Sequence, residues 1–181
     1  MSVKVSAYIA TSLDGFIARG NGDLDWLDVA NAVVPKGEDC GYGEFMESVD
    51  ILLMGRNTYE KVLSFGEWSY GDTPVVVLSR NPISFPAHLP DTVSYSSEPP
   101  TDLLLRLAGE GIKHVYVDGG KTIQGFLLAG LVDEITVTVI PVILGEGIPL
   151  YGAVESDIHL THVRTTAFDF GFVQTTYSVN Y

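Results

Sequence analysis

Two short segments combine glycine with polar or basic residues in a way that suits phosphate binding. Gly55-Arg56-Asn57-Thr58 follows one apolar run, and Gly119-Gly120-Lys121-Thr122 follows another. Where a buried strand passes into a helix, the first helical N–H groups are unpaired and that end of the helix is partly positive. A phosphate binds well at such a point, and a glycine lets it approach the backbone closely. Each segment is also compatible with an ordinary turn, with Asn57 or Thr58 capping the first helix.

A third segment, Leu78-Ser79-Arg80, ends another apolar run with a hydroxyl and a guanidinium group. An arginine can hold a phosphate through two parallel hydrogen bonds. In an open α/β sheet, ligands bind outside the carboxyl ends of the strands. Three strand ends with such residues therefore predict one nucleotide groove, although the chain has neither a G-x-G-x-x-G pattern nor a G-x-x-x-x-G-K-[ST] loop.

The elements that would hold these segments alternate between strands and helices. Apolar and β-branched runs predict strands, and apolar residues at helical spacing predict helices. The expected strands are 3–10, 50–55, 74–79, 114–118 and 133–144, the expected helices are 41–49, 58–65, 102–110 and 122–129, and a hairpin is expected over 159–166 and 172–181. This order predicts a single α/β domain over 1–181, with a mostly parallel central sheet and an antiparallel C-terminal hairpin.

The charge and cysteine content narrow the function classes. The 181 residues include 23 acids and 10 bases, which gives a formal charge of −13. Such a surface repels nucleic acid and anionic lipid, and no apolar run is long enough to predict a membrane span. The single cysteine, Cys40, permits no internal disulfide and fits a reducing compartment. We therefore expect a cytoplasmic protein with a small-molecule substrate, no nucleic-acid or membrane partner, and no metal site.

Several segments, taken in order, resemble the dihydrofolate reductase superfamily. They are Ser12–Ala18 (SLDGFIA), Met54–Glu60 (MGRNTYE), Val77–Arg80 (VLSR), Asp118–Gly120 (DGG) and Pro141–Gly147 (PVILGEG). The last is similar to stand-alone relatives of the reductase domain of the bifunctional riboflavin-biosynthesis protein. The resemblance covers nearly the whole chain. It implies a dihydrofolate reductase-like fold with helices on both faces of the sheet, NADPH as cofactor, and a homodimer formed through the strand 133–144.

The resemblance also implies roles for the groove residues. Arg56 or Arg80 would hold the 2′-phosphate, which favours NADPH over NADH. Ala10 and Ile17 would contact the nicotinamide. The peptide bond within the glycine pair 119–120 is often cis in this superfamily. The full set of expected cofactor-binding residues is Ala10, Ile17, Gly55, Arg56, Asn57, Thr58, Leu78, Ser79, Arg80, Gly119, Gly120, Lys121 and Thr122.

The catalytic residue implied by the resemblance is Asp39, an acid 16 residues before Gly55. It would bind the ring nitrogens of the substrate, and partial burial would raise its pKa. Trp26, Tyr42 and Thr138 complete the expected substrate side. Other interpretations stay open: Asp39 as a helix cap, Trp26 as a core anchor and Tyr42 as a core aromatic. The segment between Trp26 and Asp39 is longer than in dihydrofolate reductases, which puts a folate pocket in doubt.

These residues together predict an NADPH-dependent reductase. It would transfer a hydride to a C=N or C=O bond of a pteridine-, pyrimidine- or ribosylamine-like substrate, while the protein positions the reactants and excludes water. One alternative is a nucleotide-binding or regulatory module with the same groove and no reductase chemistry. Another is a flavin- or nucleotide-dependent enzyme on the same fold. The reductase prediction requires that Arg56, Ser79 and Gly120 line one groove.

Overall fold

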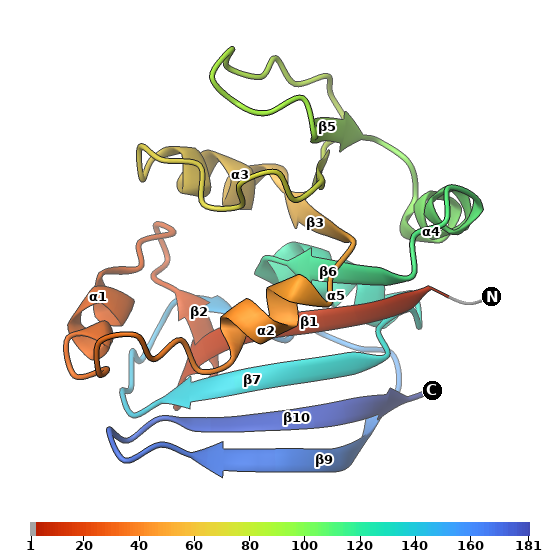
Figure 1. Cartoon of the computed structure of the whole chain (residues 1–181). Coiled ribbons are helices and arrows are strands. Elements are labelled where there is room, and N and C mark those ends of the chain that lie inside the picture. The colour runs from red at the N-terminus through yellow and green to blue at the C-terminus, as the bar shows by residue number, and fades with distance from the viewer. Residues whose placement is uncertain (1–2) are drawn as a thin grey trace.

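An eight-stranded mixed sheet forms the centre of the computed structural model, which describes residues 3–181 (Figure 1). The strands follow the spatial order β5-β4-β3-β6-β1-β7-β10-β9. Neighbouring strands from β5 to β7 are parallel, whereas β10 is antiparallel to both β7 and β9. Their bounds are β1 Lys4–Ser12, β3 Ile51–Gly55, β4 Val75–Leu78, β5 Val93–Ser96, β6 His114–Asp118, β7 Glu134–Ile140, β9 His159–Ala167 and β10 Val173–Asn180. The predicted mostly parallel sheet and closing hairpin are confirmed.

Five helices and a small second sheet surround the main sheet. The helices are α1 Asp25–Asn31, α2 Tyr42–Glu47, α3 Arg56–Leu63, α4 Pro100–Gly109 and α5 Gly120–Leu128, and the second sheet pairs β2 Phe16–Ala18 with β8 Ile148–Pro149. α4 and α5 pack on one face of the main sheet, and α2 packs on the other. In Figure 1, α2 crosses in front of β1 while α5 lies behind β6. Helices on both faces are therefore confirmed.

β3 and β4 are apolar along their whole length, as expected for parallel strands with both faces covered. In β3, Leu53 faces the cluster that contains α4 and α5, while Leu52 and Met54 face the cluster that contains α2. All three side chains are fully buried. This two-sided core fixes β3 and β6 next to each other, so the segments that follow them begin at the same edge of the sheet.

Several boundaries differ from the predictions, each for a local reason. α3 and α5 begin two residues early, at Arg56 and Gly120, directly after their strands. α4 begins at Pro100, because proline is pre-organised for the first helical position. β7 ends at Ile140, because the following proline has no N–H group for the ladder. The short elements α1, β2, β5 and β8 were not predicted.

Of two expectations drawn from the resemblance, the homodimer through the strand 133–144 stays a prediction and the cis peptide bond is wrong. β7 lies between β1 and β10, so both of its edges are paired within the sheet. Residues 3–181 contain no cis peptide bond, so the bond between Gly119 and Gly120 is trans. Gly119 instead makes the chain reversal through its φ of 90°, which glycine adopts without a steric penalty. No helix in the described part of the chain is both long and apolar enough to cross a membrane.

Candidate functional site

A cleft of about 1250 Å³ runs along the carboxyl ends of β4, β3, β6 and β1. These strands are parallel, so their ends meet at one edge of the sheet. The cleft wall includes every residue predicted to bind the cofactor: Ala10, Ile17, Gly55, Arg56, Asn57, Thr58, Leu78, Ser79, Arg80, Gly119, Gly120, Lys121 and Thr122. The requirement that Arg56, Ser79 and Gly120 line one groove is confirmed, and the roles of the individual residues stay predictions.

The two glycine segments are in direct contact. A Cβ atom at Gly55 would lie 3.1 Å from the hydroxyl oxygen of Thr122, and one at Gly119 would overlap the hydroxyl of Thr58. α3 and α5 therefore begin side by side, with glycine where the backbones approach most closely. No side chain caps either helix, so the alternative in which Asn57 or Thr58 caps α3 is wrong. The first-turn N–H groups of both helices therefore have no side-chain cap, an arrangement that suits an anion.

Basic side chains hold defined positions around these helix ends. Arg56 donates to Glu60 one turn further along α3, with 2.7 Å between Nε and Oε1. Lys61 forms an ion pair with Asp23, with 3.0 Å between Nζ and Oδ1. That pair ties α3 to the connection 19–24, whose residues Gly20, Asn21 and Gly22 line the cleft. The ion pair therefore holds this connection, which follows β2, against α3.

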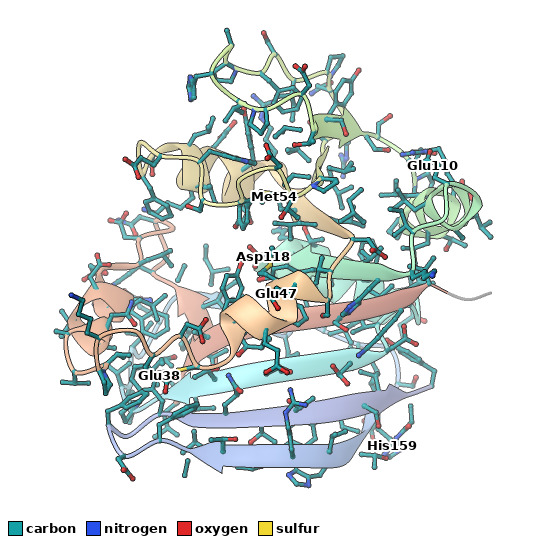
Figure 2. The ribbon with its side chains drawn as sticks, viewed as in Figure 1. Glu38, Glu47, Met54, Glu110, Asp118 and His159 are labelled. Carbon is teal, nitrogen blue, oxygen red and sulfur yellow. The ribbon has the colours of Figure 1, made fainter. Side chains whose placement is uncertain are left out.

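Asp118, the last residue of β6, is the acid that faces the cleft from the end of a central strand. Figure 2 shows it in the interior of the molecule, whereas Glu38 and His159 lie at the periphery. Its Oδ1 accepts the N–H of Gly119 at 2.8 Å. Protein atoms bury the carboxyl group, and this loss of water raises its pKa from 3.8 to about 6, although hydrogen bonds from Gly119 and Tyr116 act in the opposite direction.

The phenols beside Asp118 share its environment. Burial raises the pKa of Tyr42 to about 12 and also raises the pKa of Tyr70, and proximity to Asp118 contributes in both cases. An acid whose pKa lies near neutrality can donate a proton in a reaction and regain it from water. Sequence reasoning did not single out Asp118, although an acid directly before Gly119, at the end of a buried strand, was the available signal.

Asp39 has a different environment from the one predicted. It is exposed on the connection before α2 and does not line the cleft. Its two carboxylate oxygens accept the N–H groups of Gly41 and Gly43 at 2.8 and 2.9 Å. These hydrogen bonds stabilise the charged form and lower the pKa, so the predicted rise in pKa is wrong. Asp39 thus accepts two backbone N–H groups at the start of α2, but the N-cap residue of that helix is Gly41.

The other three residues expected on the substrate side also lie outside the cleft wall. Trp26 belongs to α1 and is buried in a separate apolar cluster with Ile140 and Phe172. Tyr42 packs among aromatic rings under α2, and its ring centroid lies 5.7 Å from that of Tyr8. Thr138 is buried and accepts a hydrogen bond from the Gln174 amide at 2.9 Å. The core interpretations of Trp26 and Tyr42 describe these contacts, and the partner of Thr138 is a protein side chain.

Comparison with protein families decides the classification. The RibD C-terminal domain family matches residues 3–173. The chain belongs to the RibD C-terminal domain family. Uncharacterized protein YwjB of Bacillus subtilis (strain 168) is 36% identical to it over 172 residues, which span 93% of this chain and 94% of that protein. The crystal structure of a candidate riboflavin biosynthesis protein from Shewanella sp. PV-4 has 39% identity and a TM-score of 0.92, and the match covers 99% of this chain and 100% of that one.

More distant structures share the fold of this RibD C-terminal domain. One is the diaminohydroxyphosphoribosylaminopyrimidine deaminase/5-amino-6-(5-phosphoribosylamino)uracil reductase of Thermotoga maritima, with 20% identity and a TM-score of 0.72, matched over 98% of this chain and 56% of that one. Another is dihydrofolate reductase from Enterococcus faecalis complexed with NADP(H), with 17% identity and a TM-score of 0.63 over 98% of this chain and 97% of that one. The dihydrofolate reductase-like fold is confirmed, and the comparisons as a whole support a reductase of the riboflavin-biosynthesis type.

Proposed function

We propose that this RibD C-terminal domain is an NADPH-dependent reductase of a small heterocyclic substrate. The observation that carries the proposal is the paired start of α3 and α5 on one cleft edge, without side-chain caps and with a glycine of each segment facing a threonine of the other. Two free helix N-termini together suit the pyrophosphate of a dinucleotide. Lys121 and Arg56 stand at these termini and add positive charge. When bound, NADPH supplies the hydride.

The basic residues of the cleft also suit the 2′-phosphate, the group that NADPH has and NADH lacks. Arg80 follows β4 at the far end of the cleft, and within residues 3–181 its side chain has no ion pair, whereas Arg56 is bound to Glu60. Arg80 is therefore the better candidate for the 2′-phosphate. A charge-assisted pair contributes about 1.5–3 kcal/mol, so Arg80→Gln should weaken NADPH binding about 10- to 100-fold and leave NADH binding nearly unchanged. Lys36→Gln, a change on an exposed connection, is the matched control.

The substrate needs a proton as well as a hydride. Reduction of a C=N or C=O bond places the hydride on carbon and a proton on nitrogen or oxygen. Asp118 is the cleft acid with a pKa of about 6, so it is the proposed proton source. After transfer the carboxylate is stabilised by the N–H of Gly119 and is reprotonated from solvent.

Thermal unfolding with NADPH tests the cofactor proposal directly. At a concentration 100 times its Kd, a ligand stabilises the folded state by about 2.7 kcal/mol. For a domain of this size, that corresponds to a rise in Tm of roughly 5–10 °C. A smaller rise is expected with NADH. If millimolar NADPH leaves the Tm unchanged, the cofactor proposal fails.

A nucleotide-binding module without chemistry is the second candidate. One observation favours it: Trp26, Asp39, Tyr42 and Thr138, all expected to contact substrate, lie outside the cleft wall. A screen of NADPH oxidation against pterins and ribosylaminopyrimidines separates the two candidates. Binding of NADPH without oxidation in that screen would favour the module. A purified protein that is yellow would instead indicate a flavin enzyme.

We also propose a homodimer, formed through β9 rather than β7. β9 is an edge strand of the main sheet, and all nine of its residues are exposed. An unpaired edge offers a row of free backbone groups to another strand. Val163→Lys places a charge in the middle of this edge and should shift the protein from dimer to monomer in light scattering. A monomeric unmodified protein would contradict the proposal.

A further inference from the structure

The small sheet of β2 and β8 forms part of the cleft wall. Ile148 of β8 lines the cleft together with Ile17 and Ala18 of β2, and we call these three residues the β2–β8 wall. A pair of short strands is only marginally stable by itself in water. The pairing is also irregular here, because the register shifts between Phe16 and Ala18. The β2–β8 wall therefore depends on contacts from other elements to hold its position.

α5 supplies such contacts from two positions that are four residues apart and therefore lie on one face of the helix. At its first residue, Gly120, a Cβ atom would lie 2.9 Å from Ile17 Cδ1 and 3.2 Å from the carbonyl oxygen of Pro149. The helix backbone thus packs directly against both strands. One turn later, Gln124 donates from Nε2 to the carbonyl oxygens of Pro149 at 3.0 Å and Leu150 at 3.2 Å.

The Gln124 amide is itself held in place. Gly152 packs so closely against it that a Cβ atom at that glycine would lie 2.9 Å from Gln124 Oε1. Leu150, which follows β8, is fully buried, and its N–H donates to the carbonyl oxygen of Gly15 at 3.0 Å. Within residues 3–181, the two bonds from Gln124 are the only side-chain hydrogen bonds that reach residues 148–150. Gln124 is thus the polar link between α5 and β8.

The same helix also contributes to the phosphate side of the cleft. Gly120, Lys121 and Thr122, in its first turn, line the cleft at the position proposed above for the pyrophosphate. Gln124 does not line the cleft, so it acts on a bound cofactor only through the β2–β8 wall. One helix therefore fixes the position of that wall relative to the proposed phosphate site.

We propose, on the basis of the reductase function proposed above, that Gln124 is a positioning residue for the nicotinamide half of NADPH. It holds β8, and through β8 the paired strand β2, where Ile17 is expected to contact the nicotinamide. Without its two hydrogen bonds, the β2–β8 wall is in place in a smaller fraction of the molecules, and the apparent Kd rises in inverse proportion to that fraction. The adenosine half binds at the other end of the cleft, near Arg80, and is unaffected.

Two ligands that differ in their nicotinamide half test this proposal on the full chain. Adenosine 2′,5′-bisphosphate has the adenosine and the 2′-phosphate of NADPH but no nicotinamide. Gln124→Met keeps the length of the side chain and removes its N–H groups. We expect this variant to bind NADPH roughly 3- to 10-fold more weakly in calorimetry and to bind the bisphosphate as the unmodified protein does. Unchanged NADPH binding, or equal weakening of both ligands, overturns the proposal.

Leu128→Ala is the matched control, because Leu128 belongs to the same helix, is 57% exposed and does not line the cleft. It should leave the binding of both ligands unchanged.

Hydrogen exchange in the free protein provides a second measurement. Gln124→Met should speed exchange in residues 15–18 and 148–150 and leave exchange in β3 unchanged. Unchanged exchange in the two segments would show that Gln124 does not hold β8, and the proposal would fail. If the unmodified protein binds neither NADPH nor the bisphosphate, the reductase proposal fails instead, so the two failures are distinguishable.

Discussion

Replacing Asp118 by asparagine should change how the stability of the fold depends on pH. The carboxyl group has a pKa of about 6 in the folded protein and 3.8 as its ordinary value. A raised pKa means that the folded state binds the proton more tightly than the unfolded state does. Ionisation of Asp118 therefore costs stability, and this cost develops between about pH 4 and pH 6. Asparagine has nearly the same shape as aspartate and carries no charge. The Asp118→Asn variant therefore does not lose folding stability through ionisation at this position.

The shift of about two pKa units sets an upper limit of about 3 kcal/mol for the total cost. Partial exposure to the cleft reduces it, because water screens the charge. With a pI of about 4.4, the protein is best studied at pH 5.0 and above. About half of the cost has already developed at pH 5.0. We therefore expect the variant to gain about 0.5–1.5 kcal/mol relative to the unmodified protein between pH 5.0 and 7.5.

Urea unfolding at several pH values measures this difference. The free energy of unfolding is extrapolated to water for the unmodified protein and for Asp118→Asn, and all other titrations cancel in the comparison. Glu155→Gln, which removes an exposed acid, serves as the control and should give a constant difference. A constant difference for Asp118→Asn over the same range would refute the raised pKa and, with it, the proposed proton source.

Three further predictions concern the cleft and its surroundings. Gly119→Ala should destabilise the protein by about 1–3 kcal/mol in urea unfolding, because its φ is 90° and a Cβ atom would overlap the hydroxyl of Thr58. Asp23→Asn breaks the pair with Lys61 and should speed NADPH release at most a few-fold in stopped-flow fluorescence, since water screens an exposed ion pair. Asp39→Ala removes the acceptor of the Gly41 and Gly43 N–H groups, so it should lower the midpoint of urea unfolding and leave the pH profile of kcat unchanged, and a shifted profile would restore its catalytic assignment.

The cofactor half of the cleft was predictable because its signals are local. A buried strand, a glycine and a helix start lie within a few residues of each other in the two segments that include Gly55 and Gly119. Parallel pairing then brings such strand ends to one edge. The substrate half was not predictable in the same way, because Asp39 and Thr138 were placed by register with a family. Their directions depend on tertiary contacts of Tyr8 and Gln174, which no local pattern reveals.

Those contacts explain why Asp39, the acid before α2, lies outside the cleft. The Tyr8 hydroxyl and the Gln174 amide both donate to the backbone carbonyl of Cys40, and Gln174 also donates to Thr138. This network holds the segment before α2 against the α2 face of the sheet, and the Asp39 carboxylate accepts the N–H of Gly43 in the first turn of that helix. Asp118 lies instead at the end of β6 and lines the cleft, and burial raises its pKa. These two properties make it the proposed proton source, which the pH dependence of Asp118→Asn tests.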